Sequence, residues 1–287
     1  MEANPGTVTL ASLRGLRAAG VNRISFGVQS FNPRQLARLG RIHDANEAVA
    51  AIALARAAGF DNVSLDLIFA LPDQTLAEWE ADLRAAVTLL PDHISAYNLT
   101  YESGTAFFAQ RAQGQLRPAP EEVEAAMFTR TQELLDAAGY SHYEISNFAR
   151  RGRECRHNLN YWRGGAYLGI GAGAHSFAHA PAPGKRWSNE NDPTLFLQRV
   201  AASGHARVFE EDLSQSQACG EFVFLGLRLR AGFDAAAFEE RFGLEFLAAF
   251  PHAARLQRDG LLARAGSCWQ LTDRGLMVAD SVFATFM

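Results

Sequence analysis

The chain has 287 residues, of which 48% are hydrophobic and 20% are charged, and its formal net charge is −4. This composition excludes a disordered, collagen-like or coiled-coil protein. The weak negative charge argues against a protein that binds nucleic acid or an anionic membrane through its overall charge. The length suits one large domain or two ordinary ones.

The first 140 residues repeat a pattern of helix, turn and strand. Ala-Ala-Gly triplets at 18–20, 57–59 and 137–139 each end a predicted helix, with the glycine at the left-handed position after it. Apolar strands are predicted at 23–28, 63–69 and 93–100, and their nearly continuous apolar character is typical of a parallel sheet buried on both faces. The pattern predicts an α/β fold whose sheet is open or forms part of a barrel, since three strands are too few to close one.

Two helices of this region have recognisable ends. Thr75 and Glu78 match a capping box for a helix that Pro91 terminates. Pro120, followed by two glutamates, begins a second helix, because proline and acidic side chains are favoured in a first helical turn.

The rest of the chain divides into two further parts. After a first domain over 1–140, a linking segment over 141–205 is rich in aromatic and polar residues. A C-terminal domain over 206–287 has Ser214 or Ser216 as the candidate N-cap of one helix, Asp234 as that of a second, and a hairpin near 261–272, a pattern typical of a winged helix. Its 8 arginines against 11 acidic residues give a net charge of −3, which argues against nucleic acid as a partner.

The spacing of the cysteines and the length of the apolar runs indicate where in the cell the protein is located. Cys155, Cys219 and Cys268 have neither zinc-site nor disulfide-framework spacing, so we expect a reducing environment. No apolar run reaches the roughly 20 residues of a transmembrane helix, and the first residues lack the features of a signal peptide. The sequence predicts a cytoplasmic protein without a transmembrane segment.

Polar residues late in the predicted strands are the first candidates for a site. Asp66 lies between two leucines of a strand, where a carboxylate is costly unless it is paired or hydrogen-bonded. Gln29, Asn98 and Thr100 also fall late in their strands. The carboxyl ends of strands in β-α folds form ligand sites, and the alternative is an Asp66 satisfied by backbone amides.

A second group follows Cys155. His157-Asn-Leu-Asn-Tyr-Trp162 combines a potential iron ligand with two aromatic rings that could pack on a porphyrin. The alternative is a structural histidine beside core aromatics. The stretch Gly169–Ala174 fits a dinucleotide-binding loop loosely, but prolines follow it instead of a helix. We expect these glycines to allow a close backbone approach to a flat or charged ligand.

Taken in order, these segments resemble the HemW-type haem chaperones, which are radical S-adenosylmethionine (SAM) proteins related to oxygen-independent coproporphyrinogen III oxidase. The resemblance extends over essentially the whole chain. Its longest motifs are Glu2–Gly6, Gly20–Phe31, Arg38–His43, Leu65–Gln74, His157–Trp162 and Gly169–His175.

The resemblance implies a partial radical-SAM (β/α)6 barrel that lacks its first strands, followed by a small helical C-terminal domain. In the family, a 4Fe-4S cluster binds SAM. Glu2 matches the position that holds the methionyl amine, and Gln29, Arg41 and Asp66 match positions that bind the SAM carboxylate or ribose. These side chains suit the roles, because an ammonium needs an acceptor and a carboxylate pairs with a guanidinium.

Three further residues are assigned by the same resemblance. Thr100 and His175 match weaker contact positions on the SAM side, and His157 is the residue associated with haem. The implied partners are haem itself and an acceptor protein that receives it.

One departure from the family pattern affects its chemistry. The cluster cysteines, spaced C-x-x-x-C-x-x-C, do not occur in this sequence, and none of its three cysteines can replace them at that spacing. We therefore expect no metal ligands in this chain and no SAM cleavage by it alone. Because the family sequence continues upstream of Glu2, Met1 is expected to be an internal methionine or a misassigned start. Missing strands would leave a sheet edge unprotected, which predicts poor solubility or a need for a partner.

Three functional hypotheses follow. The first is a haem chaperone, truncated before its cluster cysteines. The second is an oxygen-independent coproporphyrinogen III oxidase of porphyrin biosynthesis. The third is a non-catalytic remnant that acts as an interaction module or has no function.

Overall fold

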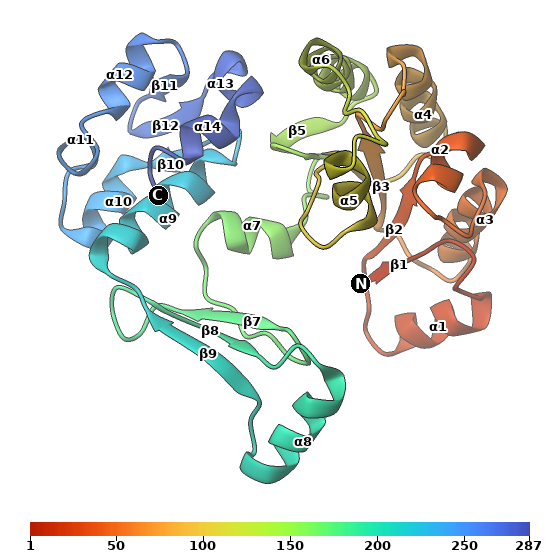
Figure 1. The fold of residues 1–287 in the computed structure, drawn as a ribbon, viewed down its shortest axis with the longest axis horizontal. Helices are drawn as coiled ribbons and strands as arrows, with labels where there is room; N and C mark the ends of the chain where they lie inside the picture. The colour runs from red at the N-terminus through yellow and green to blue at the C-terminus, as the bar shows by residue number, and fades with distance from the viewer. The chain divides into compact units, whose positions relative to one another are not determined.

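The computed structural model describes residues 1–287 and forms two compact units, Met1–Glu154 and Cys155–Met287 (Figure 1). The first unit is built on one six-stranded sheet, and the second on two three-stranded sheets. None of the helices combines the length and apolar character needed to cross a membrane.

The sheet of the first unit has the strand order β1-β2-β3-β4-β6-β5. Its first four strands are parallel, and a hairpin then adds β6 and β5 antiparallel at the other end. The strands are β1 (Glu2–Ala3), β2 (Ile24–Gln29), β3 (Val63–Phe69), β4 (His93–Asn98), β5 (Ser141–Glu144) and β6 (Asn147–Ala149). The sheet is mixed and open, so the predicted partial barrel is confirmed.

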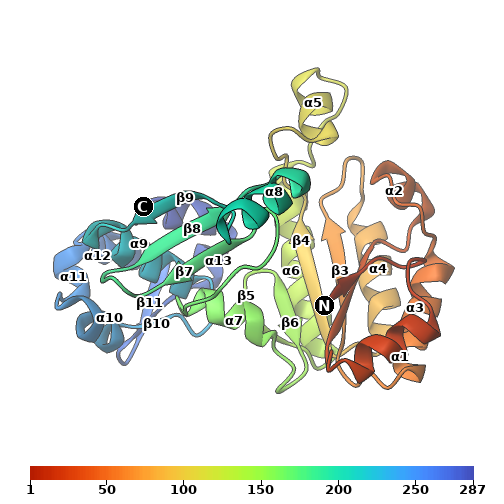
Figure 2. The same ribbon diagram turned by 90° about the horizontal axis from the view of Figure 1, so that it is seen from below.

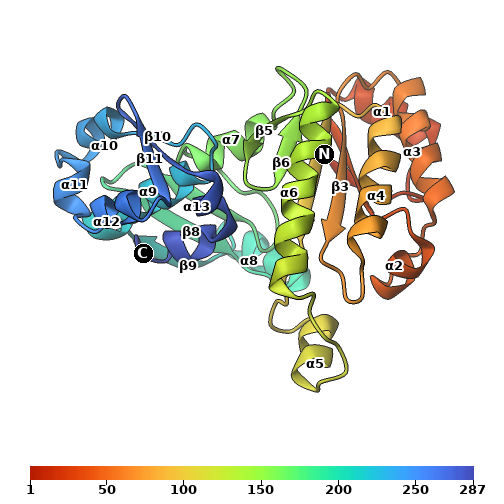
Figure 3. The same ribbon diagram turned by 90° about the horizontal axis from the view of Figure 1, so that it is seen from above.

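Helices cover one face of this sheet, and Figure 3 shows three of them, α3, α4 and α6, in a row outside the strands. α3, α4 and α6 each bury apolar side chains against the strands. The helices are α1 (Leu10–Ala18), α2 (Pro33–Arg38), α3 (Ala45–Ala57), α4 (Leu76–Thr88), α5 (Ala106–Ala112) and α6 (Glu121–Ala137).

The ends of these helices follow from local chemistry. The predicted capping box of α4 is present: the Thr75 hydroxyl accepts from the Glu78 amide at 3.2 Å, and the Glu78 carboxylate accepts from the Thr75 amide at 2.8 Å. On α4, the fully buried Trp79 indole donates to the Thr131 hydroxyl of α6 at 2.8 Å. The Trp79–Thr131 hydrogen bond joins α4 to α6 within the helix layer.

The other face of the sheet is polar. In β3, Leu65 and Leu67 point into the apolar core, whereas Ser64 and Asp66 alternate with them on the opposite face. The strands are buried on both faces as predicted, but on the second face many of the buried side chains are polar, among them Ser25, Ser64, His93 and Ser95. This face carries the first candidate site.

The second unit starts with a short helix and contains two sheets. The sheet order is β7-β8-β9 in one and β10-β12-β11 in the other, and all pairs are antiparallel. The elements of the first half are α7 (Arg156–Trp162), β7 (His175–Ala178), β8 (Lys185–Asn189), α8 (Pro193–Ser203) and β9 (Arg207–Asp212). Those of the second half are α9 (Gln215–Leu227), β10 (Phe233–Asp234), α10 (Ala235–Phe242), α11 (Phe246–Ala249), α12 (Ala253–Arg258), β11 (Leu262–Ala265), β12 (Cys268–Leu271), α13 (Asp273–Met277) and α14 (Ala279–Phe283).

The C-terminal part has the helices and the hairpin that the sequence predicts. Ser214 caps α9 and Asp234 caps α10, which ends at the left-handed Gly243. A core of phenylalanine rings holds these helices together, with Phe222 and Phe238 in edge-on contact.

Residues 141–205 contribute to both compact units. Their first nine residues form β5 and β6, because Phe148 opposite Ile94 extends the apolar core of the first sheet. From Cys155 onward they belong to the second unit. The division of the chain into three domains, over 1–140, 141–205 and 206–287, stays a prediction.

Candidate functional site

Asp66 is the centre of a hydrogen-bonded group on the polar face of the first sheet. Both of its carboxylate oxygens accept from the Ser25 hydroxyl at 3.0 Å, and Ser95 is a further hydrogen-bond partner. Burial raises the pKa of Asp66, the two serine hydroxyls oppose that rise, and the nearby Glu2 carboxylate adds to it. The structure therefore brings together Glu2 and Asp66, two of the residues assigned to SAM.

Gln29 and Arg41 meet around Asn4. The Arg41 guanidinium donates to the Asn4 side-chain oxygen at 3.2 Å. The Gln29 amide lies over Gly27, where a Cβ would sit 2.9 Å from the Gln29 Nε2 and 3.2 Å from the Asn4 Oδ1. Gly27 thus keeps open the space in which these polar groups gather.

The backbone at Gln29 is strained. Its φ is 68°, a left-handed conformation that a non-glycine residue rarely adopts, and the pairing register between β2 and β3 shifts at this residue. The Gln29 Oε1 is buried and has no hydrogen-bond partner. Strain and an unsatisfied buried acceptor on one residue are typical of a ligand site.

These residues fit SAM. Arg41 offers a cation for a carboxylate, Glu2 and Asp66 offer acceptors for an ammonium or for ribose hydroxyls, and the Gln29 Oε1 offers an unused acceptor. The residues do not fit a 4Fe-4S cluster. No group of three or more histidine, cysteine or acidic side chains could hold a metal ion, and all three cysteines lie in the second unit.

Thr100 and His175 are the two remaining residues assigned to SAM. Thr100 is exposed in the loop after β4. His175 begins β7 in the second unit, where it pairs with Ser188 of β8, and it is also exposed. Their assignment to SAM stays a prediction.

A separate candidate site lies on α7. His157 is exposed, its imidazole forms no hydrogen bond, and its ring contacts Tyr161 edge-on at 4.8 Å. Tyr161 in turn meets Tyr167 edge-on at 4.5 Å. His157 and Tyr161 are four residues apart and share one helix face. The interpretation of His157 as a hydrogen-bonded structural histidine is wrong.

The glycines after α7 approach the chain's own backbone and side chains. A Cβ at Gly169 would collide with the His175 carbonyl, and one at Gly165 would collide with the Asn160 side chain. The Gly169 amide donates to the Ser176 hydroxyl at 2.9 Å. These close approaches fold the segment against β7 and account for Gly165 and Gly169 without a ligand.

Sequence reasoning missed several residues around both sites. Asn4, Ser25 and Ser95 belong to the polar face of the first sheet. The signal was the alternation of small polar residues with apolar ones along β2 and β4, which the nearly continuous burial of these strands concealed. Arg241 and Glu221, which line a cavity of the second unit, had no local sequence signal.

Comparison with known proteins relates the whole chain to one group. The model of the radical SAM superfamily matches residues 1–86, and that of the HemN C-terminal domain matches residues 213–278. Coproporphyrinogen III oxidase (HemN) of Escherichia coli, whose structure is described as that of a radical SAM enzyme, has a TM-score of 0.82 and 25% identity to this chain. That match covers 99% of this chain and 68% of HemN.

Curated proteins similar over the full chain give the family. The heme chaperone HemW of Bacillus subtilis is 36% identical over 100% of this chain and 75% of its own length, and that of Escherichia coli is 38% identical over 100% and 74%. The mitochondrial radical S-adenosyl methionine domain-containing protein 1 of Bos taurus is 34% identical over 100% and 67%. The chain therefore belongs to the HemW family of heme chaperones, within the radical SAM superfamily.

Proposed function

We propose that this protein binds haem through His157 and passes it to an acceptor protein that requires haem. The observation that carries the proposal is the identity of 36–38% over the whole chain to proteins named heme chaperone HemW. The predicted cytoplasmic location fits this function, because transfer to newly made acceptors takes place where they fold.

The geometry of α7 supports this function. The imidazole of His157 is exposed and makes no hydrogen bond, so one ring nitrogen is available to an iron ion without the loss of an existing contact. Tyr161 and Tyr167 provide aromatic surface beside it. A ligand held by one exposed histidine is accessible to a second protein, which a carrier that releases its cargo requires.

The polar face of the first sheet supports SAM binding. Glu2 and Asp66 would accept hydrogen bonds from the ligand's ammonium or ribose hydroxyls, Arg41 would pair with its carboxylate, and Gln29 would orient it. When bound, SAM would supply a sulfonium centre. The residues of this chain bind and orient the ligand.

Titration of haem into the protein tests the haem proposal. The Soret band is expected to shift on binding, and His157→Ala is expected to weaken binding by at least about tenfold, the equivalent of about 1.4 kcal/mol. His205→Ala, at another exposed histidine of the second unit, is the matched control. Unchanged haem affinity and an unchanged spectrum in His157→Ala would remove His157 as the ligand.

A second candidate function is coproporphyrinogen III oxidase, which the TM-score of 0.82 to HemN favours. An anaerobic assay that follows conversion of coproporphyrinogen III to protoporphyrinogen IX separates the two candidates when this chain is joined to the cluster-binding segment of a HemW relative, because the chain alone has no ligands for the cluster. The chaperone proposal predicts haem binding without this conversion. A protein that stays folded and binds neither haem nor SAM would instead match the hypothesis of a non-catalytic remnant.

A further inference from the structure

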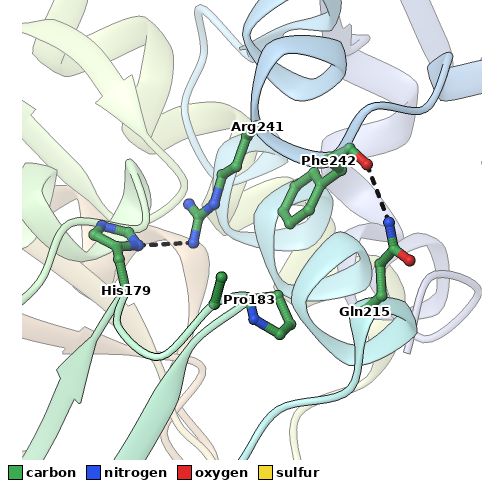
Figure 4. Close-up of a pocket in the computed structure, with 6 residues that line it drawn as sticks. His179, Pro183, Gln215, Arg241 and Phe242 are labelled. Carbon is green, nitrogen blue, oxygen red and sulfur yellow. Dashed lines mark hydrogen bonds between the residues drawn. The ribbon is translucent and has the colours of Figure 1, made fainter.

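Two cavities of the second unit meet at Arg241. One, called the aromatic cavity here, has a volume of about 250 Å³, and its walls include the rings of Tyr161, Tyr167, Phe177 and Phe222. The other has a volume of about 590 Å³ and is lined by His179, Ala182, Pro183, Gln215, Arg241 and Phe242. Figure 4 shows Arg241 extending from α10 toward His179 in this second cavity. One guanidinium therefore faces both spaces.

Arg241 has no carboxylate partner. The other arginine of the aromatic cavity, Arg186, is paired with Glu221 and with Glu211, each at 2.6 Å. Arg241 instead donates to the neutral Nδ1 of His179 at 2.9 Å and forms no ion pair. Arg186 is thus held by two carboxylates, whereas Arg241 forms no direct ion pair and interacts with Glu221 only at longer range.

The surroundings of Arg241 are apolar as well. Its guanidinium carbon lies 5.1 Å from the ring centre of Phe242 and 5.8 Å from that of Phe222. Burial lowers the pKa of Arg241, and Cys219 and Glu221 oppose this shift. A cation in such surroundings gains most from an anionic ligand group, since charge-assisted hydrogen bonds strengthen as water is excluded.

The same cavity reaches the helix that carries His157. Tyr161 and Trp162 of α7 line it, and the ring of His157 packs on Tyr161. Gly164, just after α7, has a φ of 61°, and a Cβ there would lie 3.3 Å from the Arg241 Nη1. The turn that ends α7 thus lies directly against the guanidinium.

We propose that Arg241 anchors a carboxylate of the haem bound at His157, with one edge of the porphyrin inserted between Tyr161 and Phe222. This inference rests on the proposed haem function. A cavity of about 250 Å³ is below the usual size of a pocket that encloses a whole cofactor. It has room for a ring-sized portion, because a cavity of about 150 Å³ already holds benzene. The propionates are the anionic groups on the edge of haem, so a propionate is the partner that Arg241 lacks.

The test compares haem with haem dimethyl ester, in which both propionates are neutral. Each is titrated into the wild-type protein, into Arg241→Gln and into Arg255→Gln, the last being an exposed arginine of α12 with a side chain 79% exposed. Wild type and Arg255→Gln are expected to bind haem at least about tenfold more tightly than the ester, the value of one charge-assisted hydrogen bond. Arg241→Gln is expected to bind the two ligands alike, and Arg241→Lys to retain part of the preference.

The outcomes separate this inference from the proposed function. If the wild type binds haem and the ester equally, Arg241 does not anchor a propionate, although haem binding itself stands. This outcome does not depend on whether the variants fold. A full preference for haem in folded Arg241→Gln also overturns it. If the wild type binds neither ligand, the proposed function fails and the anchor fails with it.

Discussion

The carboxylate of Asp66 is buried. The group that we propose to bind SAM is therefore also one that costs folding stability when it is charged. Its folded-state pKa is raised, so folding disfavours the charged form of the side chain. The contribution of Asp66 to stability is therefore largest below its ordinary pKa of 3.8 and is lost as the pH rises through its raised value.

Asp66→Asn is expected to raise the melting temperature at pH 7, because it removes a desolvated charge. It is also expected to weaken SAM binding by at least about tenfold, because a charged acceptor is lost. Isothermal titration with SAM and thermal melts measure both effects, and Asp136→Asn, at an exposed position of α6, is the control. SAM affinity equal to that of the wild type would contradict the role of Asp66 as a ligand.

His93 makes stability depend on pH in the opposite direction. It is buried between the Ser64 hydroxyl and the Tyr143 hydroxyl, each at 2.8 Å, and burial lowers its pKa from 6.5 to about 3. The unfolded chain takes up a proton below pH 6.5 while the folded chain does not. The contribution of His93 is complete above pH 6.5 and is lost as the pH falls toward 3.

His93→Gln removes this titration. Between pH 6.5 and pH 4, the free energy of unfolding of the wild type is expected to fall more steeply than that of the variant, by up to about 1.4 kcal/mol per pH unit. Urea denaturation at several pH values measures the two slopes, with His205→Gln as the control. Parallel slopes for wild type and His93→Gln would show that His93 does not titrate this way.

Individual site residues could be predicted where a polar side chain occurs within an apolar stretch of sequence. Asp66 in an apolar strand is such a residue, and the structure places it in a polar group with Glu2. The strain at Gln29 could not be predicted, because a left-handed φ in a non-glycine residue is imposed by the bulge between β2 and β3. Arg241 was beyond prediction because the residues around it come from distant parts of the sequence.

At the scale of elements, α5 differs from every other helix of the first unit in the way it is held. None of its residues is buried, and Figure 2 shows it apart from the sheet and helices of that unit. Local unfolding of such a helix loses little apolar contact, so its opening costs little free energy.

Limited digestion with proteinase K is expected to cut the first unit initially within residues 101–119. Replacing residues 103–115 by a short Gly-Ser linker is expected to change the free energy of unfolding by less than about 1 kcal/mol. Mass spectrometry of early digestion products and urea denaturation check these statements. An initial cut within α3, α4 or α6 would contradict them.

The elements with strong local signals were predicted from sequence. The capping box of α4 and the serine N-cap of α9 depend on side chains within four residues of each other, and both are present. The two-residue strand β1 and the sheet β7-β8-β9 were missed. β1 is too short to show a period, and most residues of β9 are exposed, so it lacks an apolar pattern. β1 does lie at a sheet edge, and the expected need for a partner there stays a prediction.

At the scale of the whole molecule, most residues proposed to bind SAM lie in one unit and those proposed to bind haem lie in the other. The residues proposed for SAM, apart from His175, lie in Met1–Glu154, and His157 and Arg241 lie in Cys155–Met287. Family membership follows from similarity over the full chain, and the sequence motifs already indicated it. The conformation of the second unit around Arg241 could not follow from those motifs, since it depends on packing between α7, α9 and α10.

Native mass spectrometry of the protein after incubation with haem tests the central claim most directly. The account predicts one haem per chain for the wild type and for His205→Ala, and loss of most of this adduct for folded His157→Ala. A wild-type protein that carries no haem, or a His157→Ala variant that carries as much as the wild type, would contradict it.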